Sequence, residues 1–212
     1  MNETKVRILN TAERLLAEEG MDVSLRTITT EAGVNLAAVN YHFQSRDALV
    51  EAIIARRFAP MNAHRIELLD ALEAEHPDGP LPLEKVLEAF LSPIMKFTEA
   101  DADNFRPLVG RCFSMPEVFL RQVFERHLAP VMQRFNHAFG RAVPEISELD
   151  RQWRLIFSIG AMVHVMSWAK LLPRISQGAL DPTDTPALTR RIVTFAAAGF
   201  RATVAQAGSE CQ

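Results

Sequence analysis

The sequence predicts an all-α protein. Apolar residues recur every three or four positions over most of the 212 residues, and no convincing pair of strands interrupts this periodicity. Capping residues and prolines mark the ends of several of these stretches. Within residues 24–46 a glycine separates two short helical stretches, which is the pattern of a helix-turn-helix. We therefore expect a three-helix domain at 1–48 and a larger helical domain at 49–212.

The first two helices have recognisable ends. Apolar residues at helical spacing extend from Lys5 to Glu19, and Gly20 closes this helix. Ser24 suits the cap of the second helix, and Gly33 supplies the positive φ that ends it.

The third helix is short, and most of its residues are small or polar. Val39 and Phe43 continue the apolar side, and the residues between leave no room for a large apolar face. A segment of this kind suits the floor of a DNA major groove.

A long helix is expected next. Ser45 suits its cap, and its apolar positions continue past Leu72. Pro60 should interrupt or kink it, because proline removes one backbone hydrogen bond and clashes with the preceding turn. Residues 76–82 are rich in turn formers, and helical periodicity resumes at Val86.

Two more helices follow a break near Pro116. A continuous apolar stripe extends from Glu117 to about Arg141. Ser147 and Asp150 form a capping-box pattern for a helix that reaches about residue 172 and is apolar on more than one side.

The last helix should follow a loop at residues 173–185, with Thr185 as its cap and Pro186 at its first position. It contains the small residues 196–199, which permit close helix packing. The last two helices are therefore candidates for a four-helix interface in a homodimer. The core of a monomeric bundle is the alternative.

The N-terminal motif resembles a known family. Ile28, the run Ala32–Val34, the run Tyr41–Phe43, Arg46 and the pair Ala48–Leu49 have the order and spacing of the N-terminal domain of TetR-family transcriptional regulators. The resemblance covers about residues 5–58 and implies an all-helical dimer that binds operator DNA. Members usually release DNA when a small molecule binds the C-terminal domain.

Two residues depart from the family pattern. Thr29 stands where the family more often has alanine, and Asn40 stands where it has tyrosine, with Tyr41 as the neighbouring aromatic. Asn40 is therefore expected to read a base instead of contacting a phosphate. The segment 32–43 also resembles a narrower, PsrA-like branch that includes regulators of fatty-acid metabolism.

The predicted DNA contacts come from three places. The outer side of the second helix offers a guanidinium and hydroxyl groups for phosphates or an adjacent base. The third helix offers methyl groups for thymine, amides for adenine and a phenol for phosphate, while His42 either packs at the helix end or contacts DNA. The amino-terminal end of the long helix suits a phosphate group, because its free backbone amides can donate hydrogen bonds to the phosphate oxygens. The predicted residues are Arg26, Thr27, Thr30, Asn35, Ala37, Ala38, Asn40, Tyr41, His42, Gln44, Ser45 and Arg46.

The C-terminal domain is rich in Phe, Met and Trp, and most such residues in any protein form the core. The resemblance implies a cavity between these helices, which would suit a hydrophobic effector such as a fatty acid or acyl thioester. Arginines and histidines lie among the apolar positions. In one interpretation, one of them binds the carboxylate or other polar head group of the effector; in the other, the arginines face solvent and the histidines are hydrogen-bonded in the core. The predicted ligand-binding residues are Phe97, Phe105, Arg106, Arg111, Phe113, Met115, Phe124, His127, Trp153, Phe157, His164 and Trp168.

Other functions have little support. The chain has no phosphate-binding glycine loop, HExxH or GxSxG motif, and Asp101 with Asp103 is too small a group for a metal site. We expect no catalytic residue, metal or cofactor. The first alternative is a regulator that responds to another hydrophobic compound. An enzyme or a helical adaptor is the further alternative, and alanine at Arg26, Asn40 and Tyr41 would leave the function of either one unchanged.

Charge and cysteine content are those of a cytoplasmic protein. The net charge is −3, so the overall charge does not indicate a nucleic-acid-binding protein. Cys112 and Cys211 are far apart, and no secretion signal or apolar run of membrane-spanning length is present. We expect a soluble protein with reduced thiols and no membrane partner.

The predicted mechanism is that of a conditional repressor. A homodimer would place two recognition helices in successive major grooves of double-stranded operator DNA, about 34–36 Å apart. An effector in the C-terminal domain would bias the long helix after Ser45 and so change that spacing, with Pro60 as a hinge.

Overall fold

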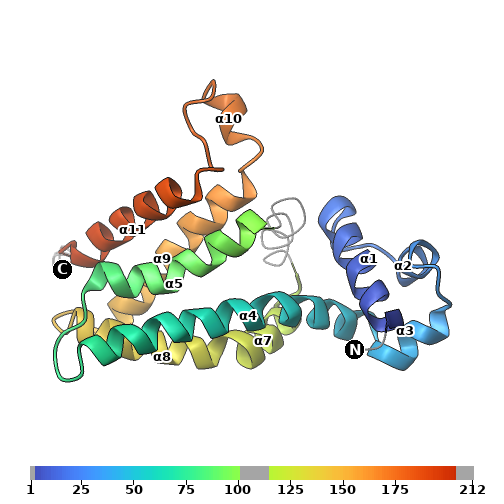
Figure 1. The fold of residues 1–212 in the computed structure, drawn as a ribbon, viewed down its shortest axis with the longest axis horizontal. Coiled ribbons are helices and arrows are strands. Elements are labelled where there is room, and N and C mark those ends of the chain that lie inside the picture. The colour runs from blue at the N-terminus through green and yellow to red at the C-terminus, as the bar shows by residue number, and fades with distance from the viewer. Residues whose placement is uncertain (1–2, 101–114, 204–212) are drawn as a thin grey trace, which may run out of the picture.

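The computed structural model describes residues 3–100 and 115–203, and within them every regular element is helical, as predicted. Figure 1 shows a small cluster of helices and a larger bundle, joined by a helix that extends from the first into the second. Within the described ranges, no helix is long and apolar enough to cross a membrane. The elements are α1 (Glu3–Glu19), α2 (Leu25–Glu31), α3 (Leu36–Phe43), α4 (Arg46–Glu75), α5 (Leu83–Ala100), α7 (Glu117–Val123), the π-helix η1 (Phe124–Leu128), α8 (Ala129–Ala142), α9 (Glu148–Ser167), α10 (Leu172–Ile175) and α11 (Thr185–Arg201).

The N-terminal domain consists of α1–α3 and the first turns of α4. Ile8 and Leu16 of α1, Ile28 of α2 and Val39 of α3 are buried in its core. Gly33 has φ +61°, as the sequence predicts for the residue after α2. A Cβ atom there would meet nothing within 4 Å, so the left-handed backbone, and not lack of space, favours glycine.

Helix α4 links the N-terminal domain to the C-terminal helical domain (Figure 1). Its cap is Ser45, as predicted, whose Oγ accepts a hydrogen bond of 3.1 Å from the Ala48 amide. The sequence predicted an interruption or a kink at Pro60; α4 is not interrupted there but is a single helix of 30 residues through that position. Pro60 is exposed, so water can solvate the carbonyl that loses its partner.

The predicted helix from Glu117 to about Arg141 is divided. A π-helical turn, η1, separates α7 from α8, and the Ala129 amide donates to the carbonyl of Phe124, five residues earlier. Pro130 follows directly; it has no amide hydrogen, and its ring would clash with the carbonyl four residues before it. The wider π turn accommodates that proline.

The last elements differ from the prediction by small shifts. Helix α9 begins after Ser147, as predicted, but ends at Ser167, and α10 forms a short turn within the region expected to be a loop. Asp184, and not Thr185, caps α11, because its Oδ1 accepts a 2.9 Å hydrogen bond from the Ala187 amide.

Four buried phenylalanines connect the helices of the C-terminal domain. The ring centroids of Phe90 and Phe135 are 4.9 Å apart, those of Phe135 and Phe139 are 6.4 Å apart, and those of Phe139 and Phe200 are 5.0 Å apart. These residues belong to α5, α8 and α11. The row of rings therefore joins three segments that are distant in the sequence.

Candidate DNA-binding surface and its connections

Helices α2 and α3 form the predicted helix-turn-helix. The Ser24 Oγ accepts a 3.1 Å hydrogen bond from the Thr27 amide and lies 2.8 Å from the Thr27 Oγ1. Arg26 and Thr30 are exposed on α2. The Thr27 hydroxyl thus has a partner within the cap, whereas Arg26 and Thr30 extend into solvent.

Helix α3 presents a polar face. Val39 and Phe43 are buried on one side, and Ala37, Asn40 and Tyr41 are exposed on the other. The Tyr41 side chain is 83% exposed. An aromatic residue in that position, beside an exposed amide, offers groups that can bind base edges or phosphates.

Several predicted contacts also have structural partners. The Asn35 Oδ1 caps α3 by accepting a 2.9 Å hydrogen bond from the Ala38 amide, so only its Nδ2 is left to donate outward. Ser45 caps α4 and is exposed, as is Gln44, which has φ +66°.

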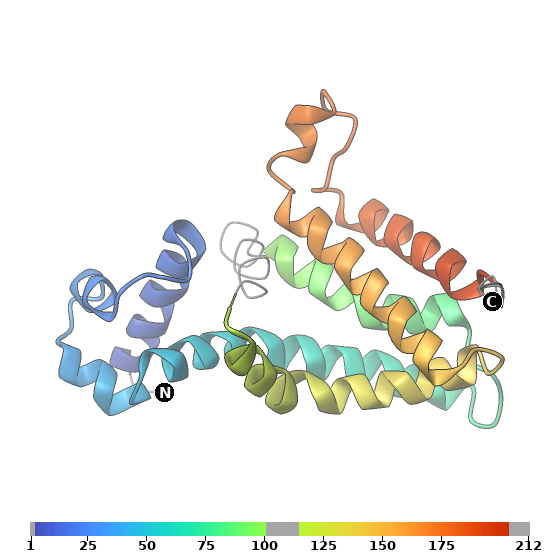
Figure 2. The ribbon, with the colours of Figure 1, turned by 180° about the vertical axis from the view of Figure 1, so that it is seen from behind.

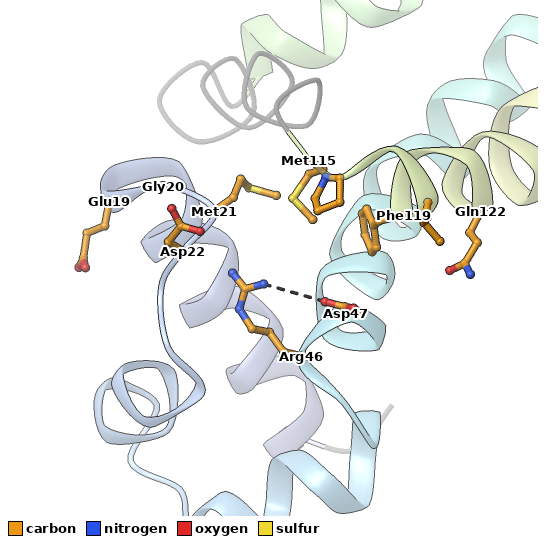
Figure 3. Close-up of a pocket in the computed structure, with 11 residues that line it drawn as sticks. Glu19, Gly20, Met21, Asp22, Arg46, Asp47, Met115, Phe119 and Gln122 are labelled. Atoms are coloured by element: carbon orange, nitrogen blue, oxygen red, sulfur yellow. Dashed lines mark ion pairs between the residues drawn. The ribbon is translucent and has the colours of Figure 1, made fainter.

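Arg46, predicted to contact a phosphate from the start of the long helix, has a structural partner as well. Its Nε donates a 3.2 Å hydrogen bond to the Val23 carbonyl, and Figure 3 shows its guanidinium pointing away from α3. The side chain therefore ties the start of α4 to the loop before α2. The family pattern places an arginine here, but its position in a motif does not reveal which way it points.

Two ring contacts define the end of α3. The His42 ring lies 5.0 Å from that of Tyr41 and 6.2 Å from that of Phe43, both edge to face. This arrangement supports the packing role among the two that the sequence left open for His42. Lys5 of α1, which sequence reasoning missed, has its Nζ 5.5 Å from the Phe43 centroid and places a positive charge beside α3. No local motif could indicate it, because it belongs to another helix.

Helix α1 is fastened to α4 by a buried carboxylate. Glu13 is 2% exposed and accepts hydrogen bonds from the guanidinium groups of Arg56 and Arg57. Arg56 also donates a 2.7 Å hydrogen bond to the Oδ1 of Asn10. The N-terminal domain is therefore held to α4 three turns beyond the cap of that helix.

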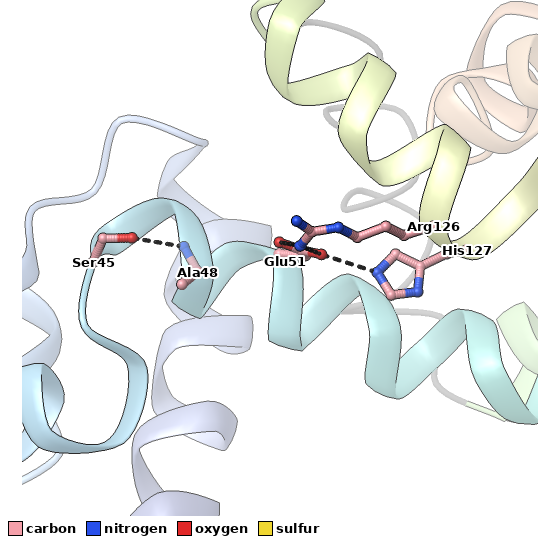
Figure 4. A network of polar contacts seen from close by, with 5 residues as sticks. All are labelled: Ser45, Ala48, Glu51, Arg126 and His127. Atoms are coloured by element: carbon pink, nitrogen blue, oxygen red, sulfur yellow. Dashed lines mark hydrogen bonds and ion pairs between the residues drawn. The ribbon is translucent and has the colours of Figure 1, made fainter.

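A second ionic contact joins α4 to η1 (Figure 4). The two Glu51 oxygens accept hydrogen bonds of 2.8 and 3.0 Å from Arg126 Nη1, and the His127 Nε2 lies 3.3 Å from Glu51 Oε1. Burial raises the pKa of Glu51, but the hydrogen bonds of Arg126 and His127 outweigh it and leave the pKa below its usual value. Glu51 therefore carries a negative charge at neutral pH.

A buried polar chain continues from the same turn. The Asn62 Nδ2 donates a 2.7 Å hydrogen bond to the His127 carbonyl, and the Asn62 Oδ1 accepts one of 3.1 Å from Arg65. The Arg65 Nε donates a 2.8 Å hydrogen bond to the Phe90 carbonyl, and the guanidinium lies 4.5 Å from the Phe90 centroid. Burial lowers the pKa of Arg65 to about 10, so it remains charged at neutral pH. These contacts join α4, α5 and η1.

The predicted ligand-binding residues are dispersed. Phe105, Arg106, Arg111 and Phe113, with the side chain of Phe97, lie outside what the structure describes. Met115 is buried and lines a pocket between the N-terminal domain and α7. Phe124 lines a separate cleft of about 420 Å³ between α8 and α9, and His127 contacts Glu51.

The remaining four predicted ligand residues are exposed on the outer face of α9 or, for Trp168, directly after its last residue, and they do not lie between described helices. Trp153 is 52% exposed and Phe157 62% exposed, their rings stack at 5.7 Å, and His164 and Trp168 are also exposed. Figure 2 shows α9 in front of α5 and beside α11, which adds the exposed Phe195. The sequence correctly indicated that α9 is apolar on more than one side, but the described residues of the chain leave one of those sides uncovered.

Comparisons with known families agree with this architecture. Residues 8–53 match the family of bacterial regulatory proteins called the tetR family, and residues 88–199 match the tetracyclin repressor-like C-terminal domain. The fold and site are therefore those of a DNA-binding transcriptional regulator, and the chain belongs to the TetR family. Members of this family are transcription factors and not enzymes; they act as dimers and bind small-molecule effectors.

Individual relatives are distant. The chain is 28% identical over 136 residues to the HTH-type transcriptional dual regulator CecR of Shigella flexneri, and the match covers 61% of this chain and 60% of that protein. A regulatory protein of the tetR family from Rhodococcus RHA1 has a TM-score of 0.66 at 16% identity, with 96% of this chain and 100% of that chain covered. The fatty acid degradation regulator FadR from Bacillus halodurans has a TM-score of 0.62 at 15% identity, with coverages of 96% and 99%. At these identities the two structures establish the fold alone.

Proposed function

We propose that this chain is a repressor that a small hydrophobic effector, such as a fatty acid or acyl thioester, releases from its operator. The observation that carries the DNA-binding part is the exposed polar face of α3, where Asn40 and Tyr41 extend outward from a helix anchored by Val39 and Phe43. Those two residues, with Ala37, are proposed to read base edges and phosphates. Arg26 and Thr30 of α2 and Lys5 of α1 add contacts to the DNA backbone.

The regulator is proposed to act as a homodimer in the cytoplasm, with a domain boundary near residue 48. The exposed face of α9 and α11, which we call the apolar α9 face, supports the dimer. It includes Trp153, Ile156, Phe157 and Phe195, and burying such a surface against its copy removes it from water.

The proposed mechanism uses α4 as the connection between the two domains. Glu13 holds the N-terminal domain to Arg56 and Arg57, and Glu51 holds the same helix to η1. An effector that favours another position of α7 or α8 would therefore move α4 and, with it, α3. It must bind the two conformations with different affinities to do so.

The acyl effector is supported by the PsrA-like resemblance of residues 32–43 and by the fatty acid regulator among the structural neighbours. Phe124, the first residue of η1, lines the cleft between α8 and α9, and it is the described residue through which an apolar ligand in that cleft would act on η1.

The test is a mobility shift at fixed salt with the DNA upstream of the protein's own coding region, with and without a long-chain fatty acid or acyl thioester. Specific binding that the lipid reverses supports the proposal. Binding that is indifferent to both lipids contradicts the acyl effector, and absence of specific binding, at this and other candidate promoters, contradicts operator recognition. Transcription from the bound promoter should fall; a rise would contradict repression.

A further inference from the structure

A pocket of about 570 Å³ lies between the N-terminal domain and α7 (Figure 3). Met21 and Asp22 of the α1–α2 turn form one wall, Arg46 and Asp47 form the floor, and Met115 and Phe119 form the opposite wall. Sites for small molecules commonly have volumes of about 300–1,000 Å³. This pocket is thus large enough for a ligand, and both domains contribute to it.

The apolar part of the lining is adaptable. Met21 points from its turn toward Met115, and Phe119 lies beside Met115 on α7 (Figure 3). Met115 and Phe119 are largely buried, and Val118 at the edge is exposed. Methionine side chains adjust to ligands of different shape and interact favourably with aromatic groups. An aromatic or branched apolar body therefore suits these walls.

The charged part of the lining has an excess of carboxylates. Glu19, Asp22 and Asp47 provide three negative charges, and Arg46 provides one positive charge. The Arg46 Nη1 lies 4.0 Å from Asp47 Oδ1, and its Nε is bonded to the Val23 carbonyl. Glu19 points outward at the rim, whereas Asp22 lies next to Met21 (Figure 3). The pocket would therefore repel the carboxylate of a fatty acid and attract a cation.

We propose that this interdomain pocket binds a small hydrophobic cation, at a site separate from that of the acyl effector. An occupant would contact the α1–α2 turn and α7 together and so fix the distance between the two domains. Because α3 belongs to the same domain as that turn, occupancy changes operator affinity. This last consequence rests on the proposed function, whereas binding itself does not.

Equilibrium dialysis of the full-length protein, without DNA, with tetraphenylphosphonium tests the site. The expected result is one bound cation per chain, weakened by salt, and no comparable binding of tetraphenylborate, which has the same shape and the opposite charge. Asp22→Lys should weaken phosphonium binding about tenfold or more, since it replaces attraction by repulsion. Asp78→Lys, which makes the same change in the exposed turn after α4, should leave it unchanged.

Three results would overturn the proposal: equal binding of both ions, equal loss in the two lysine variants, or no saturable phosphonium binding. Val118→Trp, at an exposed edge of the pocket, provides a steric test and should also abolish binding. In a mobility shift, a phosphonium concentration that saturates the wild type but not Asp22→Lys should change the operator affinity of the wild type alone. Unchanged affinity of the wild type overturns the regulatory consequence, and failure of operator binding itself is a failure of the proposed function instead.

Discussion

Two exposed surfaces of this chain have opposite compositions. The outer face of α3 carries Asn40 and Tyr41 beside small residues, whereas the outer face of α9 carries Trp153, Ile156 and Phe157. Neither face is covered by other described residues of the chain. Amide and hydroxyl groups suit the grooves and phosphates of DNA, and a row of large apolar side chains suits another protein surface.

The interiors of the two regions also differ. The N-terminal domain is held to α4 by the buried carboxylate of Glu13, while the C-terminal domain encloses the guanidinium of Arg65. A buried guanidinium must be hydrogen-bonded, and the partners of Arg65 are the Phe90 carbonyl and the Asn62 amide oxygen. The Glu13 carboxylate has its guanidinium partners on α4, and Arg65 bonds to α4 and α5, so each buried charge fastens α4 to a neighbouring helix.

The largest effect on stability is expected for Arg65→Ala. It would leave the Phe90 carbonyl and the Asn62 amide oxygen without their donor and would open a cavity beside Phe90, at a cost of about 3–5 kcal/mol. Urea unfolding at fixed protein concentration measures it. Arg134→Ala removes a guanidinium that is half exposed, paired with Asp70 and Glu73, and should cost less than about 1 kcal/mol. Equal costs would contradict this difference between core and surface.

Dimerisation should depend on the apolar α9 face. Phe157→Glu would bury a carboxylate in the proposed interface twice, once for each copy, and should weaken the dimer about a hundredfold, or roughly 2.7 kcal/mol. Sedimentation velocity over a concentration series measures the change. Val118→Glu alters an equally exposed apolar residue on α7 and should leave the dimer intact. If both variants dimerise like the wild type, the interface lies elsewhere.

Operator affinity should depend on the polar face of α3. Alanine at Asn40 or Tyr41 is expected to weaken operator binding by about 1–3 kcal/mol, because each would remove a contact to a base or phosphate. Thermal unfolding should not change, since both side chains are exposed. Operator binding is measured by a mobility shift, and Gln152→Ala, at an exposed position of α9, is the matched control that should leave it unchanged. Undiminished binding by both α3 variants would refute the proposed reading face.

Gly33→Ala tests the turn between the two motif helices. An alanine at φ +61° should destabilise the N-terminal domain by about 1–2 kcal/mol through backbone strain. Gly79 does not have a positive φ, so alanine there should be nearly neutral in the same denaturation experiment. A neutral Gly33→Ala would show that the turn relaxes to another conformation.

The smallest effect concerns the contact between Glu51 and η1. Its pKa is lowered in the folded chain, so it stabilises the fold above the ordinary carboxyl pKa of ~4.3, and this contribution disappears as the pH falls through the lowered value. Glu51→Gln should therefore cost about 0.2–1 kcal/mol at pH 7 and nothing at more acidic pH. Glu145→Gln, at an exposed site after α8, is the matched control and should change the free energy of unfolding at pH 7 by less than about 0.5 kcal/mol. A Glu51→Gln cost that persists in acid would contradict the ionic origin.

The sequence predicted the elements whose ends carry local signals. Ser24, Ser45 and Ser147 each cap the helix that the pattern assigned to them, because a hydroxyl three residues before a free amide is a local feature. The π turn before Pro130 was missed, since apolar periodicity continues across it. Likewise, continuity of α4 through Pro60 depends on that residue facing solvent, which spacing does not show.

Site residues were harder to predict because their direction depends on tertiary packing. Arg46 occupies a family position but points away from α3, and Trp153 belongs to an outer face although its spacing also suits a cavity wall. Asn62 and Arg65 lie among apolar residues on the buried side of α4. Polar residues in such positions indicate a buried hydrogen-bonded network, and the sequence therefore contained a signal for these contacts.

The most direct test of the central claim is to select the sequences that the wild-type protein binds from a random DNA library. A dimer that reads DNA with two copies of α3 predicts an inverted repeat whose half-site centres lie about 34–36 Å apart. Enrichment of that pattern, lost when Asn40 and Tyr41 are both alanine, would support the account. Enrichment of a single unrepeated site, or of no sequence at all, would contradict it.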